Sequence, residues 1–169
     1  KHAFETLHAN AGCQFDHFVL DQGSDDGTGE WLDSYEPTVL IEERENIGVC
    51  RALNKLLDVA FEIDDYDVVV KFDNDCELTQ QDTLRDVVDL VMEGGCILSP
   101  RILGLRNTPQ PMRELVIGTE PILDIPQIGG IFMAVPAWVY DEFRYDETSP
   151  LYGLDDVALC QWWRSQSGT

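Results

Sequence analysis

The segment YDVVVKFDND at residues 66–75 constrains the possible folds more than any other part of the chain. Its uninterrupted valine run predicts a central strand covered on both faces, as in a parallel sheet with a layer of helices on either side. The strand stops at Asp73, and Asp75 follows two positions later. Two carboxylates so close repel each other, and a cation beside them relieves that repulsion. The segment therefore predicts an α/β fold with an acidic site where this strand ends.

The acidic pair has more than one interpretation. A hard cation such as Mg²⁺ or Mn²⁺ matches carboxylate ligands, whereas an Asx turn followed by a helix N-cap places the same residues there without any ligand. A calcium EF-hand is excluded because its required glycine is absent. A phosphatase of the haloacid dehalogenase type also carries Asp-x-Asp after a strand, but a Gly-Thr pair is expected where Cys76 and Glu77 stand.

Short apolar runs alternate with helical patterns along the whole chain, which predicts a single α/β domain over residues 1–169. The expected sheet is mostly parallel and flanked by helices. Residues 101–127 are aperiodic and are expected to form a long loop. The expected helices are 3–11, one from about 28, 49–61, 80–93 and 155–165, and the expected strands are 15–20, 38–42, 66–72, 96–100 and 129–136.

The charge balance limits the partners. Lys and Arg number 11 against 32 Asp and Glu, and the net charge of -21 repels nucleic acid and anionic membranes. A nucleotide diphosphate can still bind where a divalent cation and a few Arg or backbone N–H groups reverse the local field. No run approaches the roughly 18 apolar residues of a transmembrane segment. The five cysteines form no CxxC pair and lie mostly in apolar runs, which indicates buried thiols in a reducing compartment and predicts a cytoplasmic location.

A second polar segment, HFVLDQGSDDGTGEWL, reads as a strand, a turn and the start of a helix. Asp21 ends the strand, and its carboxylate can accept a hydrogen bond from the N–H of a base or from a sugar hydroxyl. Gly23 and Gly27 permit a positive φ or a close approach of the backbone. Taken alone, the segment is equally well explained as a turn followed by a helix cap.

The third polar segment is ENIGVCRALN. Asn46 and Gly48 shape a loop, and Arg51 and Asn54 fall three residues apart on the helix that follows, so that both can face the same side. An Arg guanidinium can bind diphosphate oxygens with two parallel N–H hydrogen bonds. A surface Arg among many acidic residues is the competing interpretation.

Together, DQGSDDGT, NIGVCRALN and FDNDCEL resemble, in this order, the sequence blocks of the family 2 glycosyltransferases, which have the GT-A fold. The likeness continues in GGIFMAVPAWVYDEFRYDE and YGLDDVALCQWWR and covers roughly residues 13–164. It implies a nucleotide-binding half at about 1–78 and an acceptor-binding half at about 79–169. The first strand of the family's sheet is apparently missing, because this chain begins on a helix.

The resemblance assigns roles to individual residues. It implies that Asp21 binds the nucleotide, that Asp73 contacts the ribose and that Asp75 binds Mn²⁺ or Mg²⁺, while Arg51 remains the candidate for the diphosphate. In the acceptor half it implies contacts at Gly129 and Gly130, a further contact at Asp155, where the family usually has Glu, and a catalytic base at Asp156. A helix N-terminus also favours acidic residues through its dipole, which is a purely structural reason for the last two.

The implied activity is inverting, metal-dependent transfer of a sugar from a nucleotide diphosphate sugar to a hydroxyl of a carbohydrate or another acceptor. One alternative is a non-catalytic nucleotide- or sugar-binding module on the same fold. A less favoured one is phosphoryl transfer through an Asp73 nucleophile, which needs a nearby lysine, and the chain has only Lys1, Lys55 and Lys71.

Overall fold

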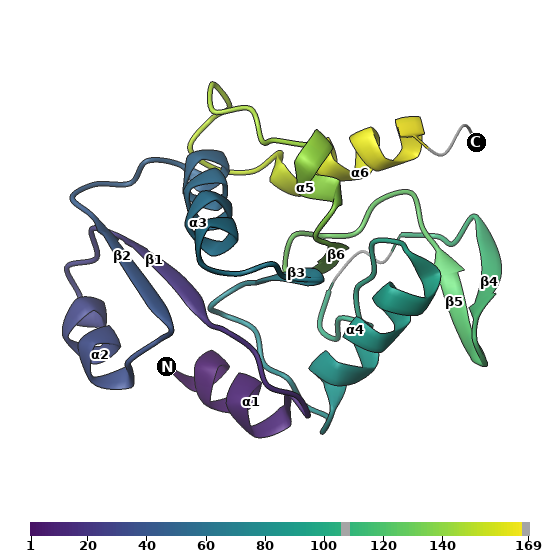
Figure 1. Cartoon of the computed structure of the whole chain (residues 1–169), viewed down its shortest axis with the longest axis horizontal. Coiled ribbons are helices and arrows are strands. Elements are labelled where there is room, and N and C mark those ends of the chain that lie inside the picture. The colour runs from purple at the N-terminus through teal and green to yellow at the C-terminus, as the bar shows by residue number, and fades with distance from the viewer. Residues whose placement is uncertain (106–108, 167–169) are drawn as a thin grey trace. The chain divides into compact units, whose positions relative to one another are not determined.

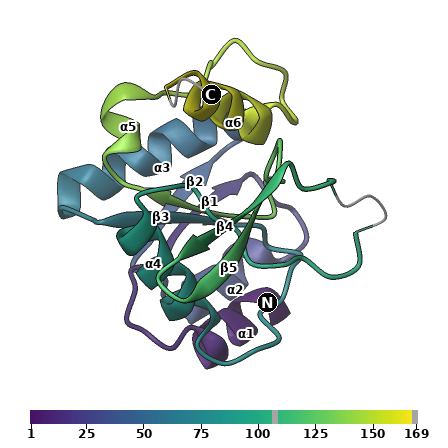
Figure 2. The same ribbon diagram turned by 90° about the vertical axis from the view of Figure 1, so that its right-hand side faces the viewer.

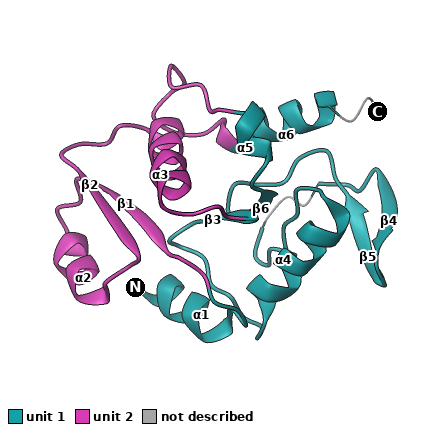
Figure 3. Ribbon diagram, viewed as in Figure 1, with its two compact units in different colours: residues 1–14, 67–143, 156–169 teal, residues 15–66, 144–155 magenta. Residues whose placement is uncertain are grey.

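A computed structural model describes residues 1–105 and 109–166, and the helices and strands alternate along the chain as an α/β protein (Figure 1). The chain divides into two compact units, coloured separately in Figure 3. Unit 1 comprises Lys1–Gln14, Asp67–Phe143 and Asp156–Thr169, and unit 2 comprises Phe15–Tyr66 and Arg144–Asp155. The α/β class predicted from the sequence is confirmed.

Unit 2 is built around a strand-helix-strand motif. Strands β1 (Phe18–Gln22) and β2 (Val39–Glu43) pair in parallel, with α2 (Thr28–Tyr35) connecting them. Helix α3 (Val49–Ile63) follows and contacts β1 through an apolar stripe. These elements begin within a few residues of the predicted positions, because their apolar periodicity and their glycine turns are local signals.

Segment Arg144–Asp155 also belongs to unit 2, although it is distant in sequence from the rest of that unit. It is joined to α3 by hydrogen bonds between Asn54 and Tyr145, which are 91 residues apart. Asn54, only 4% exposed, donates from Nδ2 to the carbonyl oxygen of Tyr145 (2.9 Å) and accepts at Oδ1 from the Tyr145 N–H (3.1 Å). The buried amide thus replaces a pair of backbone hydrogen bonds, and its place in the motif has a structural reason.

Unit 1 has its core around β6 (Phe132–Pro136), every residue of which is buried. β6 pairs antiparallel with β3 (Val68–Phe72), and α4 (Thr83–Gly94) packs on both strands. The remaining helices of this unit are α1 (His2–Asn10), α5 (Val139–Glu142) and, from its second residue, α6 (Asp155–Gln166).

Two expectations about the sheet need correction. The strands described pair only in twos, as β1–β2, β3–β6 and β4–β5, so a single, mostly parallel central sheet is not confirmed. The valine-rich β3 is half-buried, whereas β6 is fully buried, because β6 has the Leu98 bridge on its second edge in addition to its pairing with β3. The strand expected at 96–100 is reduced to one bridge between Leu98 and Ala134.

The expected loop at 101–127 contains a β-hairpin that the sequence reading missed. Strands β4 (Arg113–Ile117) and β5 (Glu120–Asp124) pair antiparallel, and β4 contacts α4 (Figure 2). Gly118, with a φ of 58°, opens the two-residue turn between them. A glycine at that position is a hairpin signal, but most of the strand residues are exposed, so the apolar pattern around it is weak.

Asp124 links this hairpin to α6. Its carboxylate, 15% exposed, accepts from Arg164 Nη2 and from Arg113 Nε, each at 2.8 Å. The bond from Arg164, followed by that from Arg113, holds the pKa of Asp124 below its usual value of 3.8. The carboxylate therefore stabilises the folded state above that value and stops doing so as the pH falls through the lowered pKa.

We expect Asp124→Asn to lower the free energy of unfolding by about 1–2 kcal/mol at pH 7, the range for hydrogen bonds to charged groups that are partly exposed. Urea unfolding between pH 7 and pH 2 measures this, and the difference from the unsubstituted protein should shrink below about pH 4. Asp58→Asn is the control, since Asp58 pairs with Arg144 on the surface and is 57% exposed. A deficit that stays constant with pH contradicts the prediction.

Candidate functional site

The turn after β1 is held by its own side chains. The Asp21 carboxylate accepts from the Ser24 hydroxyl and from the Ser24 N–H, the latter at 3.3 Å. Asp26 accepts from the Thr28 hydroxyl at 2.6 Å and the Thr28 N–H at 3.1 Å, and the hydroxyl bond is the main cause of a lowered Asp26 pKa. The Asp26–Thr28 interaction is an Asx turn, and Asp21 bonds the residue three positions further along, so the Ser, Asp and Thr of DQGSDDGT have a local structural role.

Gly23 is required by a contact outside its own turn. Its φ is 75°, and a Cβ built on it would lie 2.8 Å from the carbonyl oxygen of Arg44, which follows β2. Gln22 makes a second link, because its Oε1 accepts from the N–H groups of Ile47 (3.0 Å) and Gly48 (3.2 Å) ahead of α3. The sequence reading assigned Gln22 no role, since its partners are some 25 residues away.

Gly23→Ala should destabilise the protein by about 2 kcal/mol or more, because a left-handed backbone strains an alanine and the carbonyl of Arg44 blocks its methyl group. Gly29→Ala is a matched control: Gly29 lies in α2, and a Cβ there meets no atom within 4 Å. Gly29→Ala should leave the free energy of unfolding unchanged or raise it by at most about 1 kcal/mol. Thermal unfolding of the two variants decides, and equal stabilities contradict the prediction.

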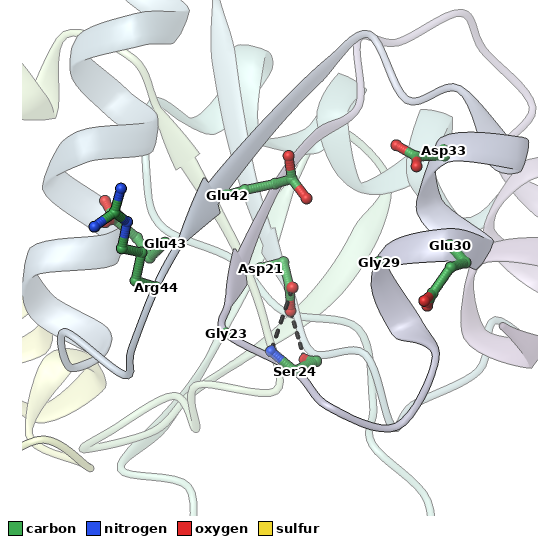
Figure 4. Close-up of a pocket in the computed structure, with 9 residues that line it drawn as sticks. All are labelled: Asp21, Gly23, Ser24, Gly29, Glu30, Asp33, Glu42, Glu43 and Arg44. Atoms are coloured by element: carbon green, nitrogen blue, oxygen red, sulfur yellow. Dashed lines mark hydrogen bonds between the residues drawn. The ribbon is translucent and has the colours of Figure 1, made fainter.

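An open pocket of about 510 Å³ lies in unit 2 beside the Asp21 turn (Figure 4). Asp21 and Glu42 are register partners on β1 and β2, and α2 contributes Glu30 and Asp33. Among the described residues that line it, Arg44 is the one that is basic. Such a lining attracts N–H and O–H donors and repels phosphate oxygens.

The structure separates Arg51 from this pocket's lining. Arg51 is exposed, and its Nε donates to the carbonyl oxygen of Glu147 at 3.0 Å. Arg51 and Asn54 therefore share a face of α3, as expected, and both contact the segment that follows Arg144. Asp155 also belongs to unit 2 and is 7% exposed.

The second group of predicted site residues lies in unit 1. Asp73 directly follows β3, donates its N–H to the Ile131 carbonyl (2.9 Å) and accepts at Oδ1 from Lys71 Nζ (2.6 Å). Asp75 is exposed in the next turn.

Burial, and then the charges of Asp73 and Asp75, raise the pKa of the Cys76 thiol to about 11, so this thiol stays protonated at neutral pH.

Asp75 offers one carboxylate, which suits a hard cation whose other ligands are water and substrate oxygens. Within residues 1–105 and 109–166, no group of three or more His, Cys, Asp or Glu side chains could hold a metal ion. Mg²⁺ commonly takes only one or two carboxylates from a protein and completes its shell with water and phosphate oxygens. One exposed carboxylate is compatible with that mode of binding and not with a closed, all-protein site.

Asp156, near the start of α6, is held on both carboxylate oxygens. Its Oδ2 accepts from the N–H of Gly130 (3.1 Å) and from Gln127 Nε2 (3.3 Å), and its Oδ1 accepts from the N–H of Val157 (2.7 Å). Gly129 is exposed, and a Cβ there would meet no atom within 4 Å. The structure thus brings Gly130 and Asp156 together, and it adds Gln127, to which no sequence motif points.

These observations define an α/β protein whose polar loops follow the carboxyl ends of β1 and β3, the position at which α/β proteins bind ligands. A family model, glycosyl transferase family 2, matches residues 1–133, and the chain belongs to this family. Neither the curated proteins nor the solved structures compared with the chain gave a match.

The match confirms the family suggested by the sequence blocks. It spans Asp21, Arg51, Asp73, Asp75 and the Gly129–Gly130 pair, and it ends before α6, so Asp155 and Asp156 lie outside it. Of the helices described, none is long and apolar enough to span a membrane.

Proposed function

We propose that this chain transfers a sugar from a nucleotide diphosphate sugar to an acceptor hydroxyl with inversion at the anomeric carbon. The family match carries the proposal, because the span it covers holds both the Asp21 loop and the Asp73–Asp75 loop. The mostly parallel sheet of a GT-A fold and a cytoplasmic location are parts of the same proposal.

The donor's base and ribose are assigned to acidic groups. Asp21 lines the acidic pocket, where a carboxylate accepts from a base N–H or a hydroxyl while the surrounding charge disfavours phosphate. Asp73 contacts the ribose hydroxyls. Arg51 is assigned to the diphosphate through its terminal guanidinium nitrogens, since its Nε already binds the Glu147 carbonyl.

Asp75 is assigned to the metal. Bound there together with the donor diphosphate, Mn²⁺ or Mg²⁺ would neutralise the negative charge that develops on the leaving group. The exposed position of Asp75 leaves room for the substrate oxygens that must complete the coordination shell.

Asp156 is assigned as the general base. It takes the proton of the acceptor hydroxyl while the acceptor oxygen bonds to the anomeric carbon and the bond from that carbon to the diphosphate oxygen breaks. The hydrogen bonds from Gly130 and Gln127 hold its carboxylate in one orientation. Gly129, Gly130 and Asp155 are assigned to acceptor contacts, and the open space beside Gly129 leaves room for such a ligand.

The experiment that tests the function combines binding and turnover. The purified chain is titrated with nucleoside diphosphates, with and without Mn²⁺, and release of the nucleoside diphosphate from its sugar conjugates is then followed with a set of hydroxyl acceptors. The proposal expects Mn²⁺-dependent binding and acceptor-dependent release, with the anomeric configuration of the product inverted by NMR. Binding without release on any acceptor favours the non-catalytic module.

One contact favours phosphoryl transfer as a second candidate. That reaction needs a lysine beside the Asp73 nucleophile, and Lys71 Nζ lies 2.6 Å from Asp73 Oδ1. Incubation with phosphate esters should then give a phosphorylated protein that hydroxylamine cleaves, and Asp73→Asn should not form it. Absence of this species, with sugar transfer intact, removes the candidate.

A further inference from the structure

Lys71 is a largely buried cation in a strand that is otherwise apolar. Its side chain is 14% exposed, and its β3 neighbours are Val70 and Phe72. Burying an ammonium group costs free energy unless acceptors replace its water. The groups that accept from Lys71 are therefore the reason that a lysine can occupy this position.

Two acceptors are contributed by different segments of unit 1. Asp73 lies two residues further along, on the same face as Lys71, and its Oδ1 accepts at 2.6 Å. The carbonyl oxygen of Gly130 also accepts from the same ammonium group. Gly130 comes into reach because β3 and β6 pair antiparallel with Phe72 opposite Phe132, which places the residues before β6 beside those after β3.

Gly130 binds a third group through the other side of its backbone. Its N–H donates to Asp156 Oδ2 at 3.1 Å, while its carbonyl accepts from Lys71. The main chain of one glycine therefore joins the Lys71–Asp73 ion pair to the carboxylate of Asp156. All four residues belong to unit 1, so the connection does not depend on the placement of unit 2.

We propose that Lys71 is a positioning residue that couples the donor contact at Asp73 to the Gly130 and Asp156 pair. The proposal rests on the transferase function given above. The Lys71 ammonium group, bound to both Asp73 and the Gly130 carbonyl, holds the Asp73 carboxylate in place for the ribose. It also orients the Gly130 peptide, whose N–H in turn orients Asp156.

The test begins with a measurement that needs no turnover. Lys71→Met keeps a chain of similar length without the charge, and Lys71→Arg keeps the charge. The ¹⁵N–¹H resonance and hydrogen exchange of the Gly130 amide are compared with those of the unsubstituted protein. Lys71→Met should shift this resonance and raise its exchange rate about tenfold or more, since the loop can then open locally. Lys55→Met, which removes an exposed lysine paired with Glu43, should change neither.

Kinetics then separate positioning from simple fold support. With correctly folded protein, Lys71→Met should raise the donor KM about tenfold and lower kcat by about 10–100-fold, because small displacements of reacting groups have effects of this size. Lys71→Arg should recover part of both. Asp73→Asn should raise the donor KM, and adding Lys71→Met to it should raise that KM no further, since Lys71 acts on the donor through Asp73.

The outcomes are distinguishable. If Lys71→Met lowers only the melting temperature and leaves the Gly130 amide, kcat and KM unchanged, Lys71 supports the fold alone and the proposal is overturned. Additive effects of Lys71→Met and Asp73→Asn on the donor KM overturn the coupling through Asp73. A perturbed Gly130 amide with no sugar transfer by the unsubstituted protein supports the coupling and rejects the transferase function.

Discussion

Asp156→Asn should lower sugar transfer by about 10²- to 10⁴-fold while leaving the fold and donor binding intact. The asparagine keeps an oxygen that can accept from the Gly130 N–H, so the loop before β6 keeps its anchor. What it loses is the ability to take a proton from the acceptor. The rate is measured at saturating donor, donor affinity by calorimetry, and stability by thermal unfolding.

A competing explanation of Asp156 makes the opposite prediction. Asp156 is the second residue of α6 and accepts at Oδ1 from the N–H of the next residue, Val157, so its charge also lies at the positive end of the helix dipole. If that is its whole role, Asp156→Asn costs about 1 kcal/mol of stability and transfer stays near normal. Asp155 is then the next candidate for the base.

Asp146→Asn is a suitable control for this prediction. Asp146 accepts from the hydroxyl of Thr148 (2.7 Å) and its N–H (2.9 Å), and those bonds lower the pKa of Asp146, so it is a turn-capping carboxylate with no assigned part in transfer. Its removal should lower the melting temperature without a comparable fall in rate.

Asp75→Asn should abolish the effect of Mn²⁺ on donor binding. We expect the affinity for the nucleoside diphosphate in Mn²⁺ to fall about tenfold or more, to the level seen with excess chelator, and transfer to fall by about 10²-fold or more, since a metal ion at a leaving group contributes several kcal/mol. Calorimetry with and without chelator measures the first effect, and nucleotide release measures the second.

The control for Asp75 is Asp65→Asn, which removes an exposed carboxylate before β3 and should leave both quantities unchanged. Equal donor affinity with chelator and with Mn²⁺ in the unsubstituted protein would show that Asp75 holds no metal. The role of the loop would then rest on Asp73 and Lys71.

The elements of unit 2 were predictable because their causes are local. The Asp21 turn is held by Ser24 and by Asp26 with Thr28, all within a few residues, and the helix that follows begins where the motif predicted it. The hairpin β4–β5 was missed because its strands are mostly exposed and carry little apolar periodicity. Gly118 was the remaining signal.

The family, the α/β class and the acidic residues at the carboxyl ends of β1 and β3 were determined by the sequence itself, since each depends on residue types at short spacing. Whether Lys71 meets the Gly130 carbonyl was decided by the tertiary structure, because the pairing of β3 with β6 joins these two residues across a separation of 59. The bond between Gly130 and Asp156 likewise joins residues that are 26 positions apart. The residue types and their spacing along the chain determine which chemical groups each local segment offers. Strand register, and the burial that follows from it, determine which of those groups meet.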